Sequence, residues 1–282
     1  MFRNMLVRLQ DSPETEFAVS AALAFAKGYG STVTGVYVRE EPPMRLPADP
    51  IGRTLATFSA HSVPVMSVDE EVYAATEGER QARTILVFET LARQSGVPFR
   101  CDVRMGSSTE AFAEGAGTAD VVTMPRNERQ KGVIGSEFEY LVKSVPHPFL
   151  IASEAIEAID RIAVAYDGSP GSVRALAAAA DIARHWKSGP PVIELVEVVP
   201  PGEPSRSHLA AAEAYLDLYE LPHTSTVLFG KPAVQLAGLA EHEEIDLFCM
   251  GAYGHSALRE LVLGSTTQAV VGARRRPILL CH

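Results

Sequence analysis

The chain has 282 residues, a net charge of −10, and 46% hydrophobic and 21% charged residues. This length suits two domains, and the acidic balance argues against nucleic acid as the main partner, because nucleic-acid-binding domains usually carry a basic surface. No apolar run reaches the roughly 18 residues of a membrane span or resembles a signal peptide. The three cysteines lack metal-ligand spacing. We therefore expect a cytoplasmic protein with reduced thiols and no membrane partner.

The first half, residues 1–155, begins with a short apolar strand and an amphipathic helix. Ser12 stands where an N-cap belongs, Pro13 at the first helical position, and Gly28 where the helix closes. A second strand follows in "STVTGVYV". The Pro-rich segment 39–70 shows no periodicity and could be a lid, an interaction loop or a partly disordered segment.

The rest of this half continues the alternation of strands and helices. "GVPFRCDVRMGSSTEAFAEGAGTADVVTM" contains a strand, a turn at Gly106, a helix and an apolar strand that ends in Met124. "GSEFEYLVKSVPHPFLIAS" contains a helix, a Pro-marked turn and a last strand.

Residues 156–282 repeat this order. "IAVAYDGSPGSVRALAAAADIARHWKSG" matches the first strand and helix, with Ser169 as N-cap, Pro170 behind it and Gly189 as the closing residue. "PPVIELVEVV" is strand-like, and the next stretch turns at Gly230 and ends in an apolar strand at Met250. "GSTTQAVVGARRRPILLCH" supplies the last helix and strand.

Strands that alternate with helices predict a parallel sheet covered on both faces, here twice in tandem. Each half ends in a short apolar strand, "HPFLIA" and "RPILLC". Hydrophobic edge strands favour pairing, and a tandem chain can satisfy both edges internally. We therefore expect the halves to pack as a pseudo-twofold pair through their last strands, with a further homodimer left open.

A glycine-punctuated segment, "GAYGHSALRELVLGST", follows the strand that ends at Met250, where an open parallel sheet binds ligands. Glycines let the backbone approach a ligand, and the helix that starts near Gly264 offers free N–H groups to an anion. The alternative is purely structural. Ser265 and Gln268 form a capping-box pattern, as do Ser136 and Glu139 in the first half.

The spacing Gly-x2-Gly-x9-Gly-Ser resembles the ATP-binding signature of the universal stress protein family, and "VAYDGS" resembles the end of that family's first strand. The resemblance covers both halves. It implies two Rossmann-like domains with open parallel five-stranded sheets, and ATP as ligand, with AMP or ADP as alternatives and Mg²⁺ accompanying the nucleotide. It places Asp167 near adenosine and the main chain at Val198 near adenine. The expected cofactor-binding residues are Asp167, Val198, Met250, Gly251, Gly254, Gly264, Ser265 and Thr266.

The first half departs from this pattern. Gln10 stands in the position of Asp167, Pro125 in that of Gly251, and Glu128 would repel a phosphate. We expect its site to be degenerate for ATP. Arg126, Arg129 and Lys131 could hold another anion or simply be solvated loop charges.

These features favour an adenine-nucleotide-binding protein with a regulatory or stress-response role and one working site, in the second domain. We expect slow ATP hydrolysis at most, no catalytic residue and no resident metal site. Two alternatives remain: a nucleotide-independent interaction module, and an adenylylating enzyme of the wider adenine-nucleotide α-hydrolase-like group. The second would require a Ser-Gly-Gly loop after the first strand, which "DGSPGS" does not supply.

Overall fold

A computed structural model of the chain describes residues 2–40, 70–125, 136–152, 156, 158–200, 208–252, 264–273 and 276–282. In the first half strands and helices alternate, and a 26-residue helix between the second and third strands was not predicted from the sequence. Its elements are β1 (Asn4–Leu9), α1 (Glu14–Tyr29), β2 (Thr32–Arg39), α3 (Glu70–Ser95), β3 (Phe99–Met105), α4 (Ser108–Ala116), β4 (Val121–Pro125), α5 (Ser136–Ser144) and β5 (Phe149–Ala152).

The second half repeats this order in its described residues, but its second helix has nine residues, whereas α3 has 26. Its elements are β6 (Arg161–Ala165), α6 (Pro170–His185), β7 (Val192–Val199), α7 (Leu209–Asp217), β8 (His223–Phe229), α8 (Pro232–Leu239), β9 (Leu247–Gly251), α9 (Ser265–Gly272) and β10 (Ile278–Cys281).

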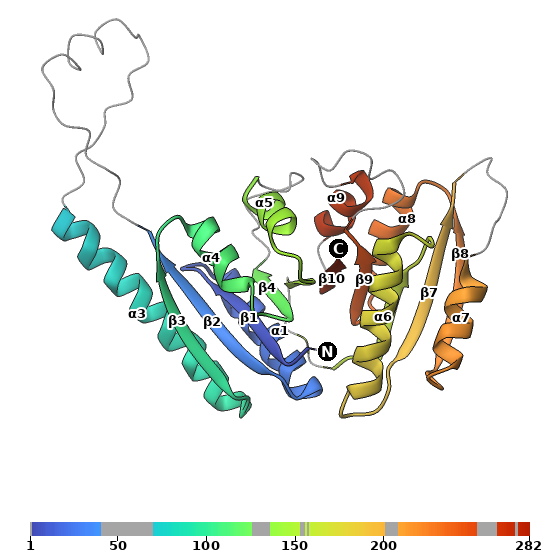
Figure 1. The fold of residues 1–282 in the computed structure, drawn as a ribbon, viewed down its shortest axis with the longest axis horizontal. Coiled ribbons are helices and arrows are strands. Elements are labelled where there is room, and N and C mark those ends of the chain that lie inside the picture. Colours follow the sequence, from blue (N-terminus) through green and yellow to red (C-terminus); the bar gives the residue numbers. More distant parts are fainter. Residues whose placement is uncertain are drawn as a thin grey trace, which may run out of the picture.

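All ten strands belong to one sheet, in the order β3-β2-β1-β4-β5-β10-β9-β6-β7-β8. Neighbouring strands within each half are parallel, while β5 and β10 are antiparallel, with Leu150 opposite Leu279. Figure 1 shows the halves side by side, with α3 and α7 at the outer ends and both termini near the middle. The expected five-stranded parallel sheets and the pairing of the last strands are therefore confirmed.

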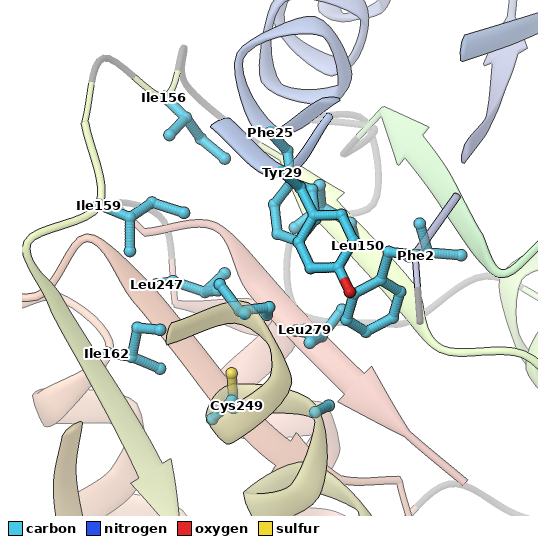
Figure 2. Packing of buried hydrophobic residues seen from close by; sticks show 14 of the residues in the cluster. Phe2, Phe25, Tyr29, Leu150, Ile156, Ile159, Ile162, Leu247, Cys249 and Leu279 are labelled. Carbon is cyan, nitrogen blue, oxygen red and sulfur yellow. The ribbon is translucent and has the colours of Figure 1, made fainter. Parts of the chain in front are cut away.

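A continuous hydrophobic core joins the halves beneath this strand pair. Phe2, Phe25 and Tyr29 from the first half pack in the same cluster as Ile162 and Leu279 from the second (Figure 2). Ile156 and Ile159, from the connection between β5 and β6, are buried in this cluster too. The pseudo-twofold arrangement is thus stabilised by side-chain burial as well as by strand pairing.

Three of the expected helix ends were wrong: the C-terminal ends of α1 and α6, and the N-terminal end of α1. α1 ends at Tyr29 and is capped by Gly30, whose φ is +87°, whereas Gly28 lies within the helix. A Cβ on Gly28 would lie 2.6 Å from Cζ2 and Cζ3 of Trp186, at the end of α6 in the other half. The contact between the halves at Trp186 therefore leaves no room for a side chain at position 28.

Gly189 lies in a turn beyond α6, which ends at His185 with Trp186 as its C-cap. Its φ of +107° suits glycine there, but it does not close the helix. At the other ends, Ser169 caps α6 with Pro170 behind it, as expected. α1 has Pro13 at its N-cap position, and Ser12 is one residue further out without a capping bond.

None of the described helices combines the length and apolarity that a membrane crossing requires.

Candidate functional site

The candidate ligand residues of the second half gather at the carboxyl ends of β6 and β9, two neighbouring parallel strands. β7 continues the sheet beyond β6, and β10 continues it beyond β9. α6 and α9 cover opposite faces, since their buried side chains belong to different core clusters. Open parallel sheets bind ligands at such a point, because the connections diverge there and leave a crevice.

Asp167 is exposed in the turn between β6 and α6, and one of its carboxylate oxygens accepts a hydrogen bond within that turn. Its Oδ1 accepts a hydrogen bond from the Ser169 N–H at 2.9 Å, and Ser169 Oγ accepts one from the Ser172 N–H at 3.3 Å. Gly168 between them has a φ of +74°. The turn therefore fixes Asp167 at the carboxyl end of β6, where the resemblance expects the adenosine.

Gly251, the last residue of β9, is in close contact with the start of α6. A Cβ on Gly251 would lie 2.7 Å from the carbonyl carbon of Gly171 and 3.0 Å from the Ser172 nitrogen. Both neighbours are backbone atoms, which cannot swing aside as a long side chain can. Packing alone therefore requires glycine at this position, whether or not a ligand binds.

The chain that leaves β9 is held at Ala252. Its N–H donates to the Cys281 carbonyl at 2.6 Å, and Thr267 Oγ1 donates to its carbonyl at 2.8 Å. The second bond joins the end of β9 directly to the first turn of α9, because Thr267 is the third residue of that helix. The N-terminus of α9 is thus fixed at the carboxyl end of β9.

That N-terminus carries no side-chain cap among the described residues. Gly264 is the N-cap, and Ser265 is already the first helical residue, so the expected capping box of Ser265 and Gln268 does not form. Gly264 has an ordinary φ of −58°, and among the described atoms a Cβ there would meet only Thr267 Oγ1, at 3.9 Å. Gly264 and Ser265 are exposed and Thr266 is half-buried, so this helix end is accessible to an anion.

Val198 and Met250 lie on strands that border the site. Val198 is half-buried on β7 opposite Leu228, and Met250 is buried on β9 opposite Leu280. The Met250 side chain packs into the core on the α8 and α9 face. A ligand contact by Met250 would therefore come from its main chain.

Sequence reasoning missed a buried carboxylate beside this site. Glu197 on β7 is 4% exposed, and its Oε1 accepts from the His208 N–H at 3.2 Å and lies 2.9 Å from His208 Nδ1. The His208 ring covers Gly168, where a Cβ would lie 2.9 Å from Cδ2. Glu197 thus fixes the start of α7 against the β6–α6 turn. An acidic residue within the apolar run "LVEVV" was the available signal.

The corresponding place in the first half is filled by an ion pair that the sequence did not predict. Arg8, near the end of β1, occupies the position of Ala165, and Glu137, the second residue of α5, occupies that of Thr266. Arg8 Nη2 donates to Glu137 Oε1 at 2.5 Å and to Ser108 Oγ at 2.7 Å. Thr109 Oγ1 also donates to Glu137, at 2.8 Å.

Two further substitutions accompany this ion pair. Gln10, in the position of Asp167, lies with its side-chain oxygen 3.3 Å from Nε and Nη2 of Arg8 in the amide orientation that satisfies both groups. Pro125 ends β4 where Gly251 ends β9. The expected capping box of Ser136 and Glu139 involves the Ser136 side chain, which lies outside the described part of the chain. Glu139 lies 3.0 Å from Lys143 in an ion pair along α5.

Several expected features lie outside the described residues. These are Gly254, segment 41–69, and the first-half loop residues Arg126, Glu128, Arg129 and Lys131.

Comparison with known proteins bears on the second half most directly. Residues 158–282 match the model of the universal stress protein family. A universal stress protein from Synechocystis sp. is 27% identical over 224 residues, which span 75% of this chain and 76% of that protein. A universal stress protein from Methanocaldococcus jannaschii is 33% identical over 54 residues, 19% of this chain and 33% of that protein.

Among solved structures, a universal stress protein from Archaeoglobus fulgidus superposes with a TM-score of 0.74 and 16% identity. The match covers 99% of this chain and 95% of that one. At this identity the likeness shows a shared fold over the whole chain.

Proposed function

We propose, on the premise that this chain belongs to the universal stress protein family through residues 158–282, that it binds one adenine nucleotide, ATP, in its second half. The nucleotide lies at the carboxyl ends of β6 and β9. The bound nucleotide gives the chain a regulatory role in a stress response, with slow hydrolysis at most.

The observation that carries this proposal is the uncapped N-terminus of α9 at the carboxyl end of β9. Its first N–H groups have no side-chain acceptor among the described residues, and the helix dipole favours negative charge there. Neither the dihedral angles of Gly264 nor the described atoms around it require a glycine. Its lack of a side chain is accounted for by close approach of a phosphate.

The remaining contacts follow from the position of the strands. Ser265 and Thr266 supply hydroxyl groups at the phosphate end, and Gly251 ends β9 beside them. Asp167 and the main chain at Val198 lie toward the adenosine end. Within the described residues no group of three His, Cys, Asp or Glu side chains could hold a metal ion, so Mg²⁺ would arrive with the nucleotide.

An adenylylating enzyme is disfavoured by the geometry of the β6–α6 turn. Ser169 already caps α6, and Gly251 packs against Gly171 in its first turn. A pyrophosphate at that helix end would have to displace both. We therefore place the phosphates at α9.

The test is calorimetric titration of ATP into the wild-type chain and into Gly264→Ala and Gly264→Glu. Both substitutions remove the glycine, but only the second places a carboxylate where the phosphate would lie. We expect Gly264→Ala to bind ATP more weakly than wild type, because its Cβ would stand where the phosphate approaches, and Gly264→Glu to lose at least about tenfold in affinity, or about 1.4 kcal/mol. Equal affinity of all three would overturn the proposed location, and no binding by any of them at millimolar ATP would favour the interaction module.

A further inference from the structure

Arg8 is a cation that the fold has enclosed almost completely. The residue is 2% exposed, and its guanidinium carbon lies 5.4 Å from the centre of the Phe112 ring. Nη2 has two acceptors, Ser108 Oγ and Glu137 Oε1. Nη1 is buried and has no hydrogen-bond partner within the described part of the chain. A buried charged donor without an acceptor is costly, which marks a place where a further acceptor would be stabilising.

Two helices direct their N-termini at the same place. α4 and α5 each have nine residues, and Arg8 contacts the first residue of α4 and the second of α5. Ser107, the N-cap of α4, makes no side-chain capping bond. Helix N-termini attract anions, and the guanidinium adds a full positive charge. In this structure the carboxylate of Glu137 is the anion bound by Arg8 at these helix ends.

Glu137 is bound there as an external oxyanion would be. Its Oε1 receives hydrogen bonds from Arg8 and from the Thr109 hydroxyl. The partners differ in exposure: the Arg8 side chain is 3% exposed and that of Glu137 is 40% exposed. The Glu137 carboxylate therefore lies nearer the protein surface and can rotate toward water, while the Arg8 guanidinium stays buried.

We propose that the first half carries its own oxyanion site, centred on Arg8, which Glu137 occupies as an internal ligand. The external ligand is a phosphate group, either inorganic phosphate or the phosphate of a small nucleotide such as AMP, and it binds by displacing the Glu137 carboxylate. Nη1 and Nη2 of Arg8 then hold two of its oxygens, because a guanidinium binds phosphate in a two-pronged manner.

The pattern of substitutions between the halves supports this inference. Arg8, Gln10 and Glu137 stand where the second half has Ala165, Asp167 and Thr266, and all three first-half side chains meet at one guanidinium. Where the second half has the exposed N-terminus of α9, the first half thus has the buried Arg8, whose counterion Glu137 can be displaced. This site lies in the other half from the proposed ATP site and does not depend on it.

The experiment measures binding of radiolabelled inorganic phosphate to the full chain by equilibrium dialysis. All variants carry Gly264→Glu, so that the second-half site does not contribute. The Gly264→Glu chain is the parent, and we compare it with the same chain carrying Glu137→Gln. This substitution keeps the size of the side chain and removes the competing charge. The matched control is Glu139→Gln, which removes one negative charge from the same helix.

We expect Glu137→Gln to bind one phosphate per chain at least about tenfold more tightly than the parent, and Glu139→Gln to behave as the parent. Adding Arg8→Met to Glu137→Gln should abolish the gain, while circular dichroism confirms that the chain is folded. The double variant Arg8→Met/Glu137→Leu, an apolar pair of similar volume, provides a second folded reference without the site. Competition by AMP against labelled phosphate identifies the source: tighter AMP binding indicates a nucleotide, and equal or weaker binding indicates phosphate itself.

Two results would overturn the proposal. One is a Glu137→Gln chain that binds phosphate no better than the parent and the Glu139→Gln control. The other is a gain that persists after Arg8→Met. In either case the ion pair would be a structural contact only.

Discussion

The backbone of Gly251 lies against that of Gly171, so that a Cβ on Gly251 would be 2.9 Å from the Gly171 Cα and 2.7 Å from its carbonyl carbon. The end of β9 and the first turn of α6 thus approach as closely as two glycines allow. Gly264, at the other end of the same sequence motif, has no comparably close neighbour in the part of the chain that the structure describes. Two glycines of one motif therefore serve different physical purposes.

This difference predicts opposite outcomes for two alanine substitutions. Gly251→Ala should destabilise the fold by about 1–3 kcal/mol, the usual cost of overpacking. Gly264→Ala should cost less than about 1 kcal/mol, since a Cβ there would lie no closer than 3.9 Å to any described atom. Urea unfolding followed by circular dichroism measures both. Equal losses would mean that the backbone contact at Gly251 relaxes freely.

Gly28 gives a second prediction, on the packing of the halves. Trp186, the only tryptophan in the chain, is 8% exposed and fills the space beside Gly28. Gly28→Ala should therefore shift the tryptophan emission to longer wavelength and lower the stability. The control is Gly78→Ala within α3, where a Cβ would meet no described atom within 4 Å. It should add about 0.5–1 kcal/mol of helix stability and leave the emission unchanged.

An unchanged emission spectrum in Gly28→Ala, or equal stability effects of the two substitutions, would contradict the described contact between α1 and Trp186.

These glycines show which features of the fold could be predicted from the sequence and which could not. Its alternation of apolar strands and helices predicts both sheets and the pairing of β5 with β10, because hydrophobic periodicity is a local signal. The pattern "KGYG" does not reveal that Gly30 takes the left-handed turn while Gly28 faces Trp186. That assignment depends on a residue in the other half.

In the candidate site, too, features set by local sequence could be predicted, and contacts between distant residues could not. Gly264 and Ser265 could be placed at a helix start from local spacing, although the capping box was wrong by one residue. The contact of Arg8 with Glu137 joins elements that are far apart in sequence, and a lone arginine in a strand gives no hint of its partner. Glu197 and His208 were missed for the same reason.

The Arg8–Glu137 pair predicts a specific acid sensitivity. Burial acts to raise the pKa of Glu137, but the charge of Arg8 and hydrogen bonds from Arg8 and Thr109 outweigh it and lower the pKa below its usual value. A carboxyl group with a lowered folded-state pKa adds stability above its unfolded pKa of about 4.3 and loses it as the pH falls through the folded value.

Glu137→Gln should therefore be less stable than wild type at pH 7, and the two stabilities should converge as the pH falls below about 4. Urea unfolding at pH 7, 5, 4 and 3 measures this difference, with Glu139→Gln, in an ion pair with Lys143 on the same helix, as the control. Parallel pH dependences of wild type and Glu137→Gln would show that the ion pair adds nothing to stability.

The cysteines predict slow thiol chemistry in the folded chain. Burial raises the pKa of Cys281 to about 12 and that of Cys249 well above its usual value, and burial with nearby Glu89 and Asp102 raises that of Cys101 to about 11. Thiolates are the reactive form, so Ellman's reagent at pH 8 should react slowly with the native chain. Three equivalents should react at once after unfolding in guanidinium. Two or more rapid equivalents in the native state would contradict the burial of Cys249 and Cys281.

The central claim, one nucleotide site in the second half, is tested most directly by native mass spectrometry of the chain before and after addition of ATP. We predict one added ATP per wild-type chain and none on Gly264→Glu, because α9 offers an open helix end while Glu137 occupies the corresponding place in the first half. Two ATP molecules per chain, or one that persists on Gly264→Glu, would contradict the account.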